Sequence, residues 1–177
     1  MLGALAISGY VLPPPVLTAE RGARRGIPSG DSLARLAELA ETQARARAKL
    51  KEQRDRFEQL YRHAEQPEVD PDDLVALAQA LRTQELENAA ILLPQIEQLR
   101  INLASPKARV DTPAIRSWRR LAEESLEIAV VWLELYQNLQ IRLFRLASDR
   151  RSETEPGSPV FDDAESATEY LRKLVAE

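Results

Sequence analysis

The sequence predicts an all-α protein. Glycine is scarce, with 6 residues in a chain of 177, and aromatic residues make up only 5%. The Ala, Leu, Glu, Arg and Gln that dominate the chain favour helices over sheets. Apolar residues recur at helical spacing in three stretches of similar length, which indicates an elongated, antiparallel three-helix bundle with coiled-coil-like packing. We expect a short fourth helix at the C-terminus and an apolar arm at the N-terminus.

Four parts follow from this pattern. We expect an arm with its linker, a helical bundle, a polar linker and a short C-terminal helix, over residues 1–30, 31–148, 149–161 and 162–177 respectively. The chain is long enough for one domain with its own core and too short for two full domains.

The N-terminal arm is apolar. No charged side chain occurs in residues 1–19, although 29% of the whole chain is charged. The apolar run 2–12 has the length of a signal-peptide core and is too short to span a bilayer. A basic segment before this run is missing, and three arginines follow it instead. Two alternatives stay open: an export or anchor segment that associates the chain with a membrane or envelope, or an arm packed on the bundle in any compartment, the cytoplasm included.

The first helix is expected over residues 32–66. Asp31 is a suitable N-cap, and Pro67 would end the helix. Apolar residues fit a heptad at both ends of this stretch. In its middle, Arg47 and Arg54 fall on the apolar seam, so we expect incomplete burial there.

The second helix is expected over residues 71–103. Asp70 is its N-cap and Pro71 its first residue. Pro94 lies inside and predicts a kink or a break. The polar run 84–88 interrupts the apolar seam, and we interpret it as a layer that sets register, with a metal or catalytic carboxylate as the alternative.

The third helix, over residues 113–148, has the clearest heptad. Thr112 caps it and Pro113 opens it. Trp118 and Trp132 lie on the seam and are expected in the core. Four further leucines widen the apolar stripe beyond what two neighbours readily cover, and we predict that they bind a partner: Leu121, Leu126, Leu133 and Leu135. The C-terminal helix, starting near Asp162, is expected to cover part of this stripe.

The residue inventory excludes several chemistries. There is no cysteine and one histidine, so disulfides, cysteine-ligated metals and sites with two histidines are impossible within one chain. None of the common glycine-rich phosphate-binding motifs occurs. We therefore predict no metal and no cofactor.

One pair of residues has a catalytic pattern. Arg56 and His63 are seven residues apart, so both lie on one face of the first helix. An arginine can stabilise a phosphorane while a histidine moves protons. This R-x6-H spacing resembles the motif of the HEPN ribonucleases, which are small helical bundles with a site shared across a dimer. Phe57 follows the arginine here, where those families usually carry Asn or Asp.

The first helix also carries a basic stretch, residues 44–57. Arg45, Lys49 and Lys51 are its candidates for an anionic partner such as a lipid headgroup. The alternative is a solvated face paired with the acidic second helix. The chain has a net charge of −4, and the stretch lacks interleaved aromatic residues, so nucleic acid is not the expected partner.

Together these observations favour a non-enzymatic helical interaction or scaffold module. It would bind a protein partner or a second copy through its helices, and its N-terminus could tether it to a membrane. A metal-independent ribonuclease acting through Arg56 and His63 is the enzymatic alternative. A helical regulator that responds to a ligand is the third.

Overall fold

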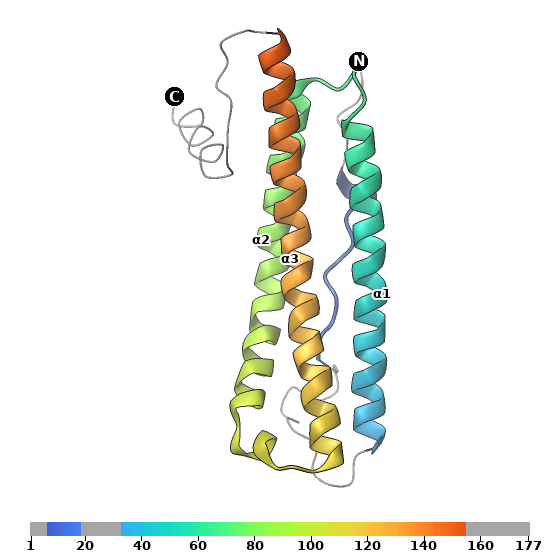
Figure 1. Ribbon diagram of the computed structural model, residues 1–177, viewed down its shortest axis with the longest axis vertical. Coiled ribbons are helices and arrows are strands. Elements are labelled where there is room, and N and C mark those ends of the chain that lie inside the picture. Colours follow the sequence, from blue (N-terminus) through green and yellow to red (C-terminus); the bar gives the residue numbers. More distant parts are fainter. Residues whose placement is uncertain (1–6, 19–32, 155–177) are drawn as a thin grey trace. The chain divides into compact units, whose positions relative to one another are not determined.

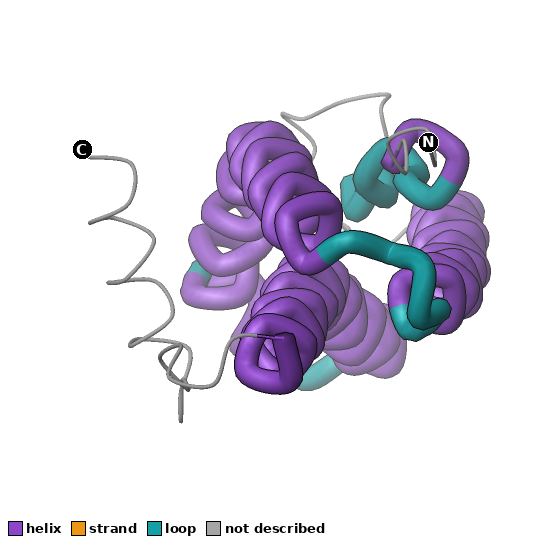
Figure 2. The backbone as a smooth tube through the Cα atoms, turned by 90° about the horizontal axis from the view of Figure 1, so that it is seen from above, coloured by secondary structure: helices purple, strands orange, loops and turns teal. Residues whose placement is uncertain are grey.

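The structure, a computed structural model, is all-α and describes residues 7–18 and 33–154. Three α-helices and two short 3-10 helices make up this part of the chain, and it contains no strand (Figures 1 and 2). Their bounds, in chain order, are η1 Ile7–Gly9, α1 Leu33–Ala64, α2 Pro71–Ala104, η2 Pro106–Arg109 and α3 Pro113–Thr154. The predicted fourth helix in residues 162–177 and the N-cap Asp31 lie outside the described residues.

The starts of α2 and α3 follow their local capping signals. The Asp70 carboxylate accepts a hydrogen bond from the Asp72 amide at 2.8 Å. The Thr112 hydroxyl accepts one from the Ile115 amide at 3.2 Å. Because each cap satisfies an amide that has no partner within its helix, both helices begin where the sequence predicts.

The break predicted at Pro94 as the alternative to a kink is absent, and the end predicted for the third helix is wrong. α2 runs unbroken through Pro94, whose ring lies on the exposed side of the helix, where a missing backbone hydrogen bond costs least. α3 continues to Thr154, so residues 149–154, predicted as linker, are helical. Tertiary contacts explain the extension, because Arg150 and Arg151 bind the α1–α2 connection and the start of α2.

Internal contacts divide the chain into two compact units. The described part of the first unit contains residues 7–11, 56–85 and 135–154. That of the second contains residues 12–18, 33–55 and 86–134. Each unit therefore holds a segment of all three α-helices, and each is described separately below.

The first unit has an apolar core built from the three helix segments. Phe57 of α1 meets Tyr136 of α3 edge to face, with ring centroids 4.8 Å apart. Other buried apolar residues of this unit are Leu60, Ala64, Val69, Leu74, Leu77, Ala78, Leu81, Leu139, Leu143 and Ala147.

The second unit contains the largest core residue. Trp132 of α3 is fully buried, and Trp118 is 6% exposed, which confirms both as core residues. Other buried apolar side chains come from all three helices and from the N-terminal segment, including Leu17, Ala46, Leu92, Ile96, Leu99, Ile115, Leu121, Ala122, Ile128 and Ala129.

The predicted register of α1 is wrong in its middle. Arg47 and Arg54 are exposed, whereas Gln43, Ala46 and Gln53 are buried. Glutamines therefore occupy the seam positions, and the arginines lie beside it. A glutamine can be buried without a charge when its amide finds a partner, and Gln43 bonds to the Glu124 carboxylate. Arg47 and Arg54 are themselves exposed, in line with the incomplete burial expected at these two positions.

Candidate functional site

The Arg56–His63 pair lies in the first unit, against the N-terminal segment. Arg56 Nη1 donates to the Gly9 carbonyl at 3.3 Å. His63 Nδ1 is 2.7 Å from the Tyr10 hydroxyl, and the two rings meet edge to face with centroids 6.1 Å apart. Residues 9 and 10 of the chain itself thus contact both candidate catalytic groups. Their catalytic role stays a prediction.

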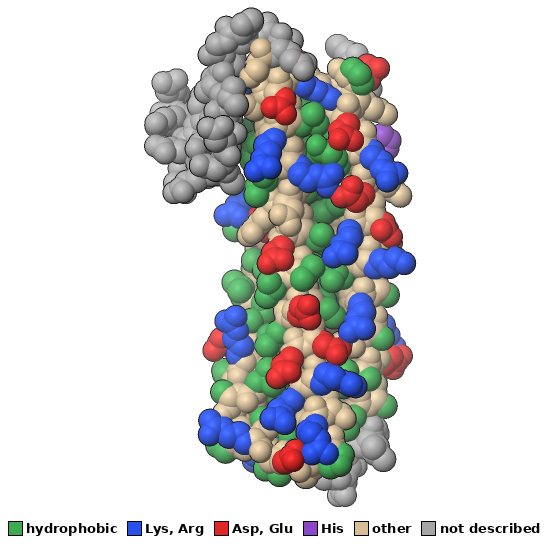
Figure 3. Space-filling view, in the orientation of Figure 1, with side chains coloured by type: hydrophobic (Ala, Val, Ile, Leu, Met, Phe, Trp, Pro, Cys, Tyr) green, Lys and Arg blue, Asp and Glu red, His purple; other side chains and the backbone are tan. Residues whose placement is uncertain are grey.

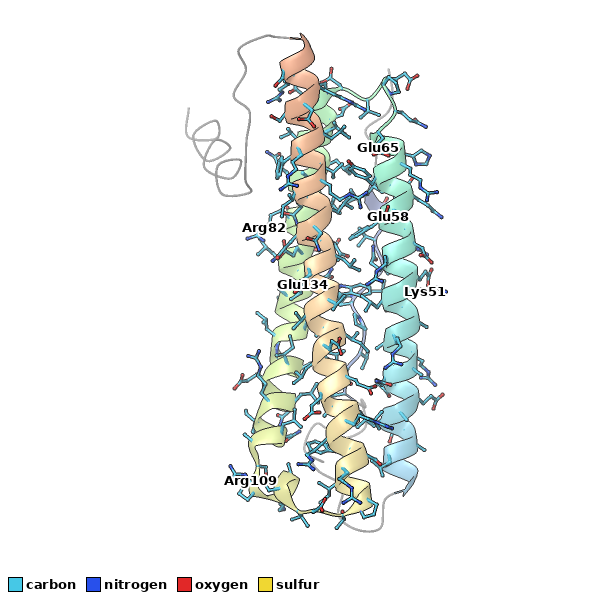
Figure 4. All side chains as sticks on the ribbon, viewed as in Figure 1. Lys51, Glu58, Glu65, Arg82, Arg109 and Glu134 are labelled. Carbon is cyan, nitrogen blue, oxygen red and sulfur yellow. The ribbon has the colours of Figure 1, made fainter. Side chains whose placement is uncertain are left out.

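The basic candidates of α1 do not form one patch. Arg45 pairs with Glu41 one turn away, and Lys51 is exposed (Figure 4). Arg45 and Lys49 are four residues apart and share a face, but Lys51 points in another direction around the helix. On the face of α1 and α3 seen in Figure 3, acidic and basic side chains are interspersed. An anionic partner for these three residues stays a prediction.

Lys49 contacts the N-terminal segment in the second unit. Its ammonium donates to the Pro14 carbonyl at 3.3 Å. Burial lowers the pKa of Lys49, and the nearby Glu52 carboxylate opposes this shift. Two glutamines that the sequence analysis did not single out also hold this segment: Gln53 accepts from the Leu12 amide and Gln95 from the Leu17 amide. The sequence signal that could have indicated such a residue is a glutamine at a position on the apolar seam of a helix, as at Gln53.

The polar run of α2 contains a buried carboxylate in the first unit. Glu85 accepts from Gln140 at 3.0 Å, Gln137 at 2.9 Å and Arg82 at 2.7 Å. Burial alone would raise the pKa of Glu85, but these hydrogen bonds outweigh it and the pKa is lowered. Three hydrogen-bond donors thus satisfy the Glu85 carboxylate, one from α2 and two from α3. Glu85 therefore joins α2 to α3, as expected of a polar layer that sets the register between two helices (Arg82 is labelled in Figure 4).

The second unit holds a buried amide from the same polar run. Asn88 is fully buried, and its side-chain nitrogen and oxygen have no hydrogen-bond partner in the part of the chain that the structure describes. No group of three or more His, Asp or Glu residues suited to a metal ion occurs within residues 7–18 and 33–154.

The predicted partner-binding leucines of α3 are largely covered. Leu121 is buried, and Leu126, Leu133 and Leu135 are half-buried. Among the described residues, the large apolar side chains that are exposed lie in the second unit, most of them on α2: Leu86, Ile91, Leu93 and Ile101 on α2, with Val16, Val110 and Val130 outside it. Leu93 of α2 is 55% exposed.

Comparison with known proteins yields no relative. No family model, curated protein or solved structure matches the chain. None of the helices in the described ranges has an apolar stretch long enough to cross a bilayer.

Proposed function

We propose that this protein is a non-enzymatic interaction module built on an antiparallel three-helix bundle, and that it binds through the exposed apolar side of α2. The supporting observation is the distribution of exposed apolar residues. Leu86, Leu93 and Ile101 are each more than half exposed and follow one another at spacings of seven and eight residues. That spacing places them on one side of the helix. We call these three residues the α2 stripe.

The α2 stripe suits another helix as its partner. An apolar row at seven- and eight-residue spacing matches the face of an amphipathic helix laid along it. Glu97 is exposed and lies on the same side of α2, between Leu93 and Ile101. A partner helix with a basic residue at that level would be favoured over one with an acidic residue. A helix of another protein or of a second copy of this chain can meet these requirements.

The enzymatic alternative receives less support. Arg56 and His63 are both contacted by residues 9 and 10 of the same chain. A ribonuclease would need these groups to approach a phosphodiester, so the segment would first have to move. Ribonuclease activity that is lost in both Arg56→Ala and His63→Ala variants would overturn the proposal of a non-enzymatic role.

A membrane tether through residues 1–19 is a second element of the proposal, and it would require residues 9–17 to leave the contacts that they make with α1 and α2. It is supported by the absence of charged side chains from this segment. A chain carrying Leu2→Asp and Leu5→Asp should shift from the membrane to the soluble fraction of cells. If the wild type is already fully soluble, or if both chains distribute equally, no tether exists.

Site-specific crosslinking in cells tests the α2 stripe. A photoreactive amino acid is placed at Leu93 or Ile101, and as a control at Gln79, an exposed polar α2 residue. We expect defined adducts from positions 93 and 101 and none from position 79. Leu86→Glu in the same chains should remove the adducts. Adducts that are equal at all three positions, or that persist with Leu86→Glu, would contradict the proposal.

A further inference from the structure

The N-terminal segment 12–18, called the strap below, lies in the second unit as an extended chain without helix or strand. Side chains of two helices bind its backbone. The Leu12 amide donates to Gln53 of α1 at 2.7 Å, and the Leu17 amide donates to Gln95 of α2 at 2.9 Å. The Pro14 carbonyl accepts from Lys49 of α1 at 3.3 Å. Lys49, Gln53 and Gln95 thus form the surface that holds the strap, which we call the groove.

The strap's own sequence suits this groove. Pro15 and Leu17 are buried, whereas Pro13 and Val16 are exposed. Prolines 13–15 have no amide hydrogen, so few backbone donors of the strap need an acceptor. Consecutive prolines also favour an extended conformation before binding, which lowers the entropy lost on docking. The groove thus recognises backbone groups and two apolar side chains two residues apart.

The groove's sequence in turn suits an occupied state. Gln53 is fully buried on the seam of α1, between apolar neighbours such as Ala46 and Phe57. In the occupied groove the Leu12 amide of the strap donates to the Gln53 side-chain oxygen, so this buried glutamine binds peptide backbone. Apolar burial alone would be served better by a leucine at position 53. The glutamine is the choice expected of a surface that binds peptide backbone.

We propose that this groove is a binding site for an extended, proline-containing segment of a partner protein, and that the strap occupies it as an intramolecular competitor. The ligand would carry proline where Pro15 lies and leucine or a similar residue where Leu17 lies. This inference rests on the proposed role as an interaction module, but it concerns a surface separate from the α2 stripe.

Because any ligand of the groove must compete with the strap, a segment of another protein is a better candidate ligand than the strap of a second copy of this chain. The strap is joined to α1 through residues 19–32, so its effective concentration at the groove is on the order of millimolar. An identical strap from a second copy at micromolar concentration would be outcompeted about a thousandfold. A partner segment must therefore bind more tightly than the strap, or meet a chain whose strap has been released.

Peptide binding to the full-length chain tests the inference. The probe is a fluorescent peptide of residues 11–18 (VLPPPVLT), followed by anisotropy. Leu17→Asn in the protein weakens the competing strap, so this variant should bind the peptide at least tenfold more tightly than wild type. Leu17→Ala should give a smaller gain, and Val16→Asn, at an exposed strap position, should behave like wild type.

The groove itself is tested in the same background. Gln95→Ala added to Leu17→Asn should weaken peptide binding at least tenfold, and a peptide with asparagine in place of its Leu17 should bind neither protein. Circular dichroism melts establish which variants are folded, and Leu17→Ala serves if Leu17→Asn is not. Equal peptide affinity in wild type and strap variants, or binding unaffected by Gln95→Ala, would overturn the inference.

The two proposals fail separately. Leu93→Glu alters the α2 stripe and should leave binding of the peptide by the Leu17→Asn chain unchanged. If the crosslinks at positions 93 and 101 are found while no strap variant binds the peptide, only the groove inference falls. If the peptide binds as expected and the crosslinks are absent, only the proposal for the α2 stripe falls.

Discussion

Arg142 of α3 makes a bidentate ion pair with Glu58 of α1. Its two terminal nitrogens donate to the two carboxylate oxygens at 2.6 and 3.4 Å (Figure 4 labels Glu58). The same guanidinium lies 3.7 Å from the centre of the Tyr61 ring. One side chain thus combines a charged hydrogen bond with a cation–π contact across the first unit.

Arg142→Ala should destabilise the protein by about 1 kcal/mol at neutral pH. Both partners are more than one-third exposed, so solvent screening reduces the ion pair to the size usual at surfaces, and the ring contact adds a comparable amount. Urea denaturation measures the change. Arg145→Ala, at an exposed position of the same helix, is the control and should stay within about 0.5 kcal/mol. Equal effects would show that the pair contributes nothing specific.

The contribution of this pair should disappear in acid. The hydrogen bond from Arg142 lowers the pKa of Glu58, against the opposing effect of burial. A carboxylate whose pKa is lowered by folding stabilises the folded state above its unfolded pKa of about 4.3. That stabilisation is lost as the pH falls through the lowered value. The stability difference between wild type and Arg142→Ala should therefore be smaller at pH 3 than at pH 7. A difference that is constant or larger in acid would contradict this assignment.

Arg150 should anchor the connection between α1 and α2. It donates to the carbonyls of Ala64 at 2.9 Å and Gln66 at 2.8 Å, and also to that of Val69. Arg150→Ala leaves these carbonyls without that donor and should cost about 1.5–3 kcal/mol. Hydrogen exchange should rise in residues 65–70 in particular. Arg150→Lys should retain part of the stability lost in Arg150→Ala, because the lysine ammonium keeps the positive charge. It cannot reach all three carbonyls, because it lacks the planar guanidinium with its several fixed donors. Unchanged exchange in Arg150→Ala would show that the connection is held by other contacts.

Trp132 should be a centre of stability in the second unit. It is fully buried, so Trp132→Ala should cost about 3–5 kcal/mol through lost contacts and a cavity. Glu127→Ala, at an exposed position of α3, should stay within about 0.5 kcal/mol. Thermal and denaturant unfolding of both variants measure this difference. Similar losses in the two variants would mean that the α3 heptad is misassigned.

Asn88 should tolerate an apolar replacement. Its buried amide has no hydrogen-bond partner among the residues described, so Asn88→Leu removes a desolvated polar group and should raise stability by about 1 kcal/mol. Asn138→Leu, at an exposed α3 position, should change stability by less than about 0.5 kcal/mol. A loss of more than about 1 kcal/mol in Asn88→Leu would show that the amide is hydrogen-bonded in solution.

Local signals in the sequence were sufficient to predict the fold class and two of the three helix starts. Asp70 with Pro71 and Thr112 with Pro113 mark these starts because a cap satisfies amides within one turn of itself, independently of the rest of the chain. The heptad of α3 was also predictable, since one strong apolar period has no competing register. The candidate surfaces were harder to predict. The exposed apolar residues of α2 were not predicted, because an apolar pattern in the sequence does not show which of its residues will be covered by a neighbouring helix.

The register of α1 and the role of the strap were decided only by tertiary structure. Along α1, one seam would include Arg47 and Arg54, and another includes Gln43 and Gln53. Periodicity alone favours neither. The second seam is the one observed, because Glu124 and the Leu12 amide, distant in sequence, supply hydrogen-bond partners for the two buried glutamines. By itself the sequence determined that α1 is a helix. Which of its faces is buried depends on residues 41 and 81 positions away along the chain, which approach it only in the folded state.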